Sequence, residues 1–201
     1  MKTKIFQRVL LAITITLLLS FDIPTGWYKT GIKPDSYEMR IDKGTGQDGK
    51  NAATIKNTEE VNESFGALMQ MSSPEKYKGK QIKMTGYLRT ENVDGYSGLL
   101  LRIDQTGLVQ YRSLEDLSNS HVSGTTEWKK YEIILGVPSN ATRITYGGML
   151  SGTGQIWFDN ISFELVDNSD NPKEPVNSNR SDVYNKIETV TDEPVNLDFE
   201  N

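Results

Sequence analysis

Few residues in this sequence could carry out catalysis. It has no cysteine and one histidine, His121, which excludes thiolate nucleophiles and zinc sites built from several histidines. A Ser–His–Asp triad would have to use His121, which lies in a polar segment, and no G-x-S-x-G motif presents a serine. Paired carboxylates must face each other across a cleft, and the neighbouring Glu115 and Asp116 give no sign of one. The sequence therefore indicates a non-catalytic protein.

A glycine-rich segment, GTGQDG at residues 44–49, matches the G-x-G-x-x-G pattern of dinucleotide sites and nearly matches a Walker A loop. Both motifs bind phosphate only when a helix N-terminus follows them. Here AATIKN follows, and its character is that of a strand. We therefore predict a glycine-rich hairpin turn.

The N-terminus has the pattern of an export signal. Lys2, Lys4 and Arg8 precede a 13-residue apolar run at residues 9–21, which is short for a transmembrane helix. Residues 1–21 are predicted to be a signal peptide. The alternatives are an uncleaved anchor, which would be the chain's one membrane contact, and a buried N-terminal helix. The protein is expected to be secreted or attached to the cell envelope.

Charge is concentrated at the C-terminus. Residues 167–201 have nine acidic and three basic residues, so they hold more than the whole net charge of −5 and leave the rest at +1. A body without a basic run lacks the electrostatic footprint of nucleic-acid binding. Residues 167–201 are predicted to be an acidic, flexible linker or tail. The final NLDFEN alternates like a strand. We expect it to be loosely docked or disordered, although it could also pair with the sandwich edge or begin a truncated second module.

The remainder alternates apolar and polar residues at period two, between turns rich in Gly, Asn and Pro. Such segments occur at residues 37–42, 52–57, 64–72, 80–93, 98–104, 108–114, 127–138, 143–150 and 155–166. The pattern predicts an all-β fold, a two-sheet antiparallel β-sandwich or jelly roll, over residues 22–166.

Four of these segments, in order, resemble the galactose-binding-like jelly rolls, in particular the carbohydrate-binding modules of the CenC type. They are KQIKMTGYLRT (80–90), WKKYEIILGVP (128–138), TRITYG (142–147) and GQIWFDNISFE (154–164). The resemblance covers about residues 26–166. It departs from the family at the start, where a strand of the form N-x-x-F-E is expected before GW. That string appears instead at the end, as NLDFEN.

The resemblance implies sugar binding on a concave outer sheet face, where aromatic rings stack on pyranose rings. The alternation places one parity of three strands outward, and Tyr96 and Trp27 in flanking loops could add stacking. The candidate ligand-binding residues are therefore Gln70, Tyr87, Arg89, Tyr96, Arg102, Asp104 and Trp27. The alternative is a solvated face with an Arg–Asp ion pair.

The resemblance also implies a structural calcium ion held by carboxylate and carbonyl oxygens. Asp159 on the closing strand is the candidate ligand, with Asp42 and Asp48 as partners. Alternatively, Asp159 caps a turn or bulge. Trp128 and Trp157 are expected to pack within the fold.

These observations predict an exported, non-catalytic module that binds carbohydrate or a cell-surface glycan. The alternative is an envelope domain that contacts a partner protein or senses a small ligand. An unrecognised hydrolase ranks third.

Overall fold

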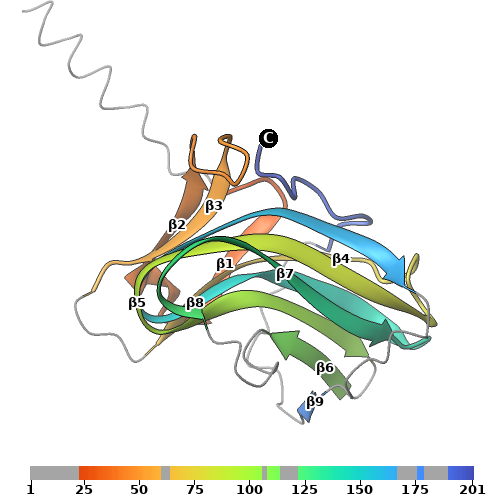
Figure 1. The fold of residues 1–201 in the computed structure, drawn as a ribbon. Coiled ribbons are helices and arrows are strands. Elements are labelled where there is room, and N and C mark those ends of the chain that lie inside the picture. The colour runs from red at the N-terminus through yellow and green to blue at the C-terminus, as the bar shows by residue number, and fades with distance from the viewer. Residues whose placement is uncertain (1–22, 60–63, 106–107, 114–121, 167–175, 179–189) are drawn as a thin grey trace, which may run out of the picture.

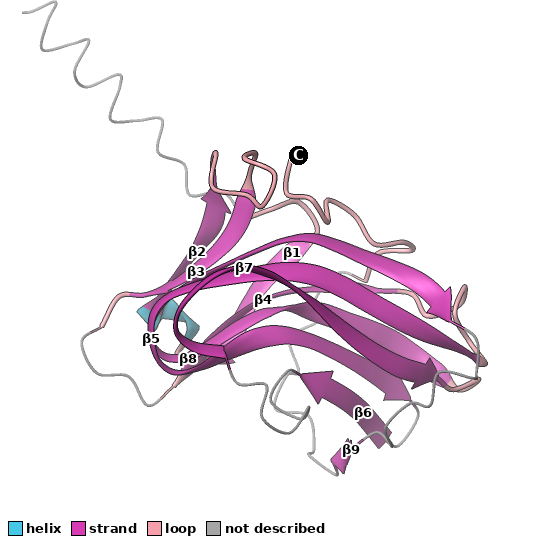
Figure 2. Cartoon of the chain, viewed as in Figure 1, coloured by secondary structure: helices cyan, strands magenta, loops and turns pink. Residues whose placement is uncertain are grey.

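The computed structural model describes residues 23–59, 64–105, 108–113, 122–166, 176–178 and 190–201. This part of the chain is built from strands and one short 3-10 helix, η1 (Pro34–Ser36) (Figure 2). The strands are β1 (Trp27–Ile32), β2 (Tyr37–Asp42), β3 (Ala52–Asn57), β4 (Phe65–Ser72), β5 (Lys80–Gln105), β6 (Leu108–Ser113), β7 (Val122–Val137), β8 (Ala141–Val166) and β9 (Val176–Ser178). None of the described segments is a helix long and apolar enough to span a membrane.

Two long strands organise the fold, since β5 and β8 pair antiparallel along nearly their whole lengths. Residues 80–91 of β5 and 155–166 of β8 lie in one layer, with β2, β3 and β7, which we call the β3 layer. Residues 94–105 of β5 and 141–153 of β8 lie in the other, with β1, β4, β6 and β9, which we call the β4 layer. The predicted all-β sandwich is confirmed. The segments predicted at 80–93 and 98–104 form one strand, β5, and those predicted at 143–150 and 155–166 form another, β8.

β5 and β8 change layers together at one corner, which lies at the left of Figure 1. Gly95 and Gly152 face each other there with φ values of 123° and 84°. A Cβ on Gly152 would lie 2.0 Å from the Asp94 carbonyl oxygen, and one on Gly95 would lie 2.3 Å from that of Ser151. Side chains are therefore excluded where the two backbones bend past each other.

The main core lies between the layers and follows the alternation of β5. Ile82, Met84 and Leu88 are buried before the corner, and Leu99 and Leu101 are buried after it. These positions alternate with Tyr87, Arg89, Arg102 and Asp104, which were predicted to face outward, so the predicted alternation of β5 is confirmed. The 43–51 segment joins the paired strands β2 and β3 as the predicted glycine-rich turn.

The orientation predicted for β4 is wrong. Gln70, expected outside, faces the main core together with Leu68, while Ala67 and Met69 face outward into a second apolar cluster with Met149. β4 is buried on both faces. A strand with apolar residues on both parities does not specify which side faces the core.

Residues 190–201, which we call the C-terminal strap, are docked on the body, so the prediction of a flexible tail is wrong for them. The strap runs beside β8 and ends near the β2–β3 turn (Figure 1, dark blue). Phe199 is 0% exposed, with its ring centroid 4.9 Å from that of Trp27 and 5.3 Å from that of Phe158. Because Trp27 belongs to one layer and Phe158 to the other, Phe199 packs against both.

Several predictions fall on residues outside the described ones. They are the signal peptide at 1–21, the segment around His121, Glu115 and Asp116, and most of the linker between residues 167 and 189.

Candidate functional site

The outer face of the β3 layer has a row of large side chains in register across the strands. Arg40 of β2 is opposite Thr54 of β3, which is opposite Trp157 of β8, which is opposite Arg89 of β5. Trp128 of β7 extends the row, since the Arg89 guanidinium carbon lies 5.6 Å from its ring centroid. The core residues Leu88, Ile156 and Phe158 alternate with this row. We call the row Arg40–Thr54–Trp157–Arg89–Trp128 the aromatic–arginine row.

Arg89 lies over the Trp157 ring at 4.1 Å from its centroid and is half-buried. Among the described residues its buried Nε has no hydrogen-bond partner, and no carboxylate forms an ion pair with it. Stacking on an indole holds a guanidinium flat and leaves its N–H donors directed outward in the ring plane. Arg89 is therefore an ordered cation with unused donors.

The base of the row is fixed by Asp42. The indole Nε1 of Trp157 donates to Asp42 Oδ2 at 2.8 Å, and Arg40 Nη1 donates to Asp42 Oδ1 at 2.7 Å. Burial pushes the pKa of Asp42 upward, but these two donors, together with the positive charges of Arg40 and Arg89, outweigh it and hold the pKa below its usual value. Arg40 also donates to Glu38 at 2.7 Å. Trp157 is thereby held with only 6% of its surface exposed.

The rim of the row offers the groups that sugar recognition uses. Trp128 is half-buried and presents part of its ring at the surface, and Tyr87 is half-buried two residues before Arg89 on the same face of β5. Gln155, beside Trp157, donates to Thr54 Oγ1 at 3.0 Å. Partly exposed aromatic rings beside planar polar groups can stack on a pyranose and hydrogen-bond to its hydroxyls.

The predicted ligand-binding residues do not form one patch. Tyr87 and Arg89 lie on the outer face of the β3 layer, whereas Tyr96, Arg102 and Asp104 lie on the outer side of the β4 layer. β5 changes layers between these two groups, so residues of outward parity face opposite sides of the molecule. Whether any of them binds a ligand stays a prediction.

Arg102 and Asp104 form the ion pair that was the alternative to a binding site. Arg102 Nη2 donates to Asp104 Oδ2 at 3.1 Å, while Arg102 Nε is 2.8 Å from Oδ1 without hydrogen-bond alignment. Arg143 Nε donates to Asp104 Oδ2 at 2.6 Å. Two guanidinium groups therefore engage one buried carboxylate.

Two other candidates are buried, which corrects their predicted accessibility. Trp27, expected in a flanking loop, begins β1 and is 6% exposed, with its Nε1 donating to the Asn196 carbonyl oxygen at 3.2 Å. Gln70 is 0% exposed. Its Oε1 accepts from the Tyr146 hydroxyl at 2.6 Å and from Val195 N at 2.8 Å, and its Nε2 donates to Val195 O at 2.8 Å. Gln70 and Trp27 therefore hold the strap.

The three carboxylates predicted to bind calcium have separate partners. Asp159 accepts from the backbone N–H of Gln47 at 2.9 Å and of Asn160 at 2.6 Å, as in the turn-capping alternative. Asp48 pairs with Lys50, and Asp42 with Arg40 and Trp157. Among the described residues no group of three or more His, Asp or Glu side chains could hold a metal. This donor set does not fit a shared calcium site. Calcium binding stays a prediction that a calcium-dependent rise in melting temperature would support.

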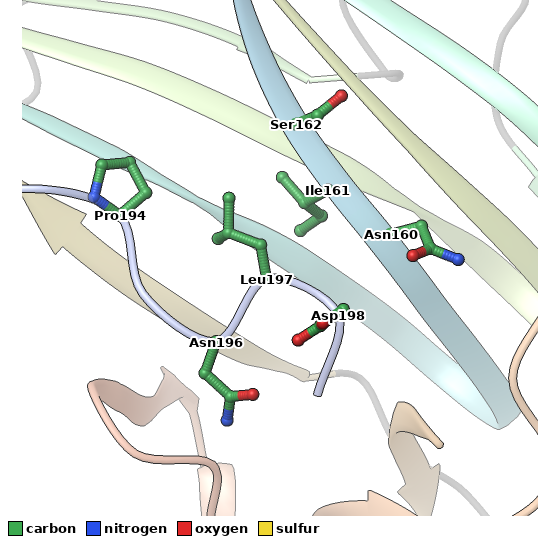
Figure 3. A pocket seen from close by; sticks show the side chains of 7 residues that line it. All are labelled: Asn160, Ile161, Ser162, Pro194, Asn196, Leu197 and Asp198. Atoms are coloured by element: carbon green, nitrogen blue, oxygen red, sulfur yellow. The ribbon is translucent and has the colours of Figure 1, made fainter. Parts of the chain in front are cut away.

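A pocket of about 580 Å³ lies between the strap and the second half of β8. Figure 3 shows its lining, residues 160–162 of β8 with Pro194, Asn196, Leu197 and Asp198 of the strap. The Ile161 N–H donates to the Leu197 carbonyl oxygen at 3.0 Å across this junction. The lining has no cation and no aromatic ring, so it does not offer the chemistry of the aromatic–arginine row.

Sequence reasoning did not assign four members of the row to a site, namely Arg40, Thr54, Trp157 and Trp128. Trp157 is buried, as expected, whereas Trp128, also expected to pack within the fold, is only half-buried. Their outward positions in the alternating strands could have indicated them, but alternation does not show which strands are neighbours.

No protein-family profile matches the chain. In a comparison with curated proteins, it is 34% identical over 179 residues to the uncharacterized HTH-type transcriptional regulator YbfP of Bacillus subtilis. The match takes in 87% of this chain, and the chain spans 56% of that relative's length.

Solved structures share the fold at low identity. The CBM22-1–GH10 modules of Clostridium thermocellum xylanase 10B, complexed with xylohexaose, match with TM-score 0.54 and 13% identity over 72% of this chain and 27% of that one. The CBM22-1 xylan-binding domain of Paenibacillus barcinonensis Xyn10C matches with TM-score 0.50 and 14% identity over 73% and 90%. The enzymatically active domain of bacteriophage CBA120 tailspike protein 4 matches with TM-score 0.52 and 14% identity over 73% and 20%. Such likeness establishes the jelly-roll fold and not the CenC type.

Proposed function

We propose that the chain is a non-catalytic binding module that holds a carbohydrate on the outer face of the β3 layer. The single observation that carries this proposal is the aromatic–arginine row. It combines a partly exposed indole, Trp128, with a stacked guanidinium, Arg89, which forms no hydrogen bond or ion pair with a side chain of the described residues. The fold that the chain shares with a domain described as xylan-binding supports the choice of ligand class, although fold alone does not establish function.

The test is affinity electrophoresis of the full chain through gels that contain xylan and other soluble polysaccharides. Trp128→Ala removes the stacking ring and is expected to weaken retention about fivefold, since such ring contacts contribute about 1 kcal/mol. Arg102→Gln and Tyr96→Ala, on the other layer, serve as controls and should leave retention unchanged. Circular dichroism verifies that all variants fold.

The opposite result would contradict this placement. Retention that is lost in Arg102→Gln and kept in Trp128→Ala would move the site to the β4 layer. If no polysaccharide, and no glycan on an array, binds the wild-type chain, the carbohydrate proposal fails.

A second candidate function is suggested by the relative described as a transcriptional regulator. In this alternative the chain is the ligand-sensing part of a larger protein. A chimera of the Bacillus subtilis relative, with its matching region replaced by this chain, would test it. Reporter expression that changes when a glycan or small ligand is added supports sensing, and a reporter that never responds opposes it.

The proposal includes export. The basic start and the apolar run at residues 9–21 support it. Cell fractionation with N-terminal sequencing checks it, since an exported and processed chain would begin after this run and be found outside the cytoplasm.

A further inference from the structure

The ligand's charge can be inferred from the neighbours of Arg89, and this step rests on the proposed function. Arg40, the other arginine of the row, is neutralised by Glu38 and Asp42. Both Asp42 oxygens are already engaged, by Trp157 and Arg40. Lys130, on the neighbouring strand β7, forms an ion pair with Glu132, with its Nζ 3.1 Å from Glu132 Oε1. Within the described part of the row, Arg89 is thus the cation that forms no ion pair, although its charge lies close enough to Asp42 to help lower the pKa of that carboxyl.

The geometry of Arg89 favours one kind of acceptor. A guanidinium held flat on an indole presents a fork of N–H donors that matches a carboxylate in two parallel hydrogen bonds. The Nε of Arg89 is buried and has no acceptor among the described residues, so a ligand would approach the two Nη groups, which form no hydrogen bond with the described residues either. A sugar hydroxyl would satisfy one donor, whereas a carboxylate would satisfy two donors and the charge.

We propose that the ligand is an acidic oligosaccharide, whose uronic-acid carboxylate binds Arg89 while a sugar ring stacks on Trp128. The 5.6 Å between the Arg89 guanidinium carbon and the Trp128 ring centroid places the cation and the ring within reach of one sugar residue. Because the contact is charge-assisted at a partly exposed site, its affinity falls as salt rises.

The test uses a glycan array that presents uronic-acid oligosaccharides beside their carboxyl-reduced, neutral counterparts, followed by calorimetry with tetragalacturonate and the corresponding reduced tetrasaccharide. The wild-type chain is expected to bind the acidic members at least tenfold more tightly than the reduced ones, and less tightly at 500 mM than at 50 mM NaCl. Arg89→Gln should abolish that preference. Arg143→Gln, which removes an arginine from the other layer and leaves Asp104 paired with Arg102, is the matched control and should keep it. Free galacturonate separates a requirement for the sugar chain from binding of a carboxylate alone.

The outcomes separate the two proposals. Equal binding of acidic and reduced glycans, unchanged in Arg89→Gln, leaves carbohydrate binding standing and overturns the acidic ligand. Binding restricted to neutral glycans does the same. Tight binding of free galacturonate, with no gain from the chain, overturns the oligosaccharide. A complete lack of glycan binding overturns the proposed function and this inference together.

Discussion

Asp159 shows how one buried carboxylate shapes the properties of this protein. It is 1% exposed and accepts hydrogen bonds from the backbone N–H groups of Gln47 and Asn160. Burial raises its pKa from 3.8 to about 6, opposed by these hydrogen bonds and assisted by the charges of Asp48 and Glu200. The side chain joins the β2–β3 turn to the closing strand, so its protonation acts on the stability of that corner.

A raised native pKa has a definite sign for stability. The folded protein binds this proton more tightly than the unfolded chain, so the contribution is fully present below about pH 4 and is lost as pH rises through 6. We expect the free energy of unfolding to lose up to roughly 3 kcal/mol from this group over that interval. Asp159→Asn should remove the loss, as measured by urea unfolding at pH 4.5 and pH 7.

The control for this prediction is Asp48→Asn, since Asp48 is exposed and its backbone hydrogen bond from Lys50 lowers its pKa. This variant should keep most of the decline towards neutral pH, because the Asp48 charge is a smaller cause of the raised Asp159 pKa than burial is. If Asp159→Asn and the wild type lose stability in parallel, the carboxylate of Asp159 is not the cause.

At the scale of elements, the strap and the corner do most to complete the sandwich. The strap is held by side chains of residues more than 100 positions earlier, among them Gln70, Trp27 and Asn51. Its Phe199 fills the space between Trp27 and Phe158. A segment that is acidic and short in apolar residues therefore docks through one aromatic anchor and several backbone hydrogen bonds.

Phe199→Ala is expected to lower the free energy of unfolding by about 3–5 kcal/mol, because it leaves a cavity between the layers. Val190→Ala is the matched control in the same segment, since Val190 is exposed, and it should cost less than about 0.5 kcal/mol. Chemical unfolding of both variants measures the difference. Equal stabilities would show that Phe199 does not anchor the strap.

Gly152→Ala should also destabilise the protein, by about 2 kcal/mol or more, because a Cβ at this positive φ would meet the Asp94 carbonyl oxygen. Gly124→Ala separates the two causes, since Gly124 has φ 70° with nothing within 4 Å of its added Cβ. Its cost, about 1 kcal/mol, reports backbone strain alone. Melting temperatures of the two variants compare them, and equal losses would remove the steric clash as an explanation.

For the whole molecule, the shared strands make the two layers one unit. β5 and β8 each contribute to both, and the strap packs across them. Neither layer can lose its strands without exposing the apolar face of the other, which favours a single cooperative transition. The two layers nevertheless present different outer faces. The β3 layer has the aromatic–arginine row, and the β4 layer has the second apolar cluster, with Met69 and Met149, and the ion pairs of Asp104.

Urea unfolding followed by tryptophan fluorescence and by far-ultraviolet circular dichroism should therefore give one midpoint. Fluorescence reports local packing around the tryptophans, and dichroism reports the strands as a whole. The Phe199→Ala variant should shift both curves together. Separate midpoints for the two signals would contradict a shared core.

The alternation of single strands was readable from the sequence because it records local burial. It predicted the all-β sandwich, the inward residues of β5, and the outward positions of Tyr87 and Arg89. These features depend on residues that are close together in the chain. Within one strand, the two-residue period indicates which side chains are buried.

Features that depend on distant partners were decided only by the tertiary structure. The corner at Gly95 and Gly152 takes β5 from one layer to the other, so its outward residues before and after the corner face opposite sides of the molecule and could not form one patch. Gln70 is buried because its amide groups find Tyr146 and Val195, 76 and 125 positions away. NLDFEN is ordered because β1 and β8 leave a space that Phe199 fills. Composition and alternation do not predict such contacts, because the energy of each contact depends on which strands become neighbours.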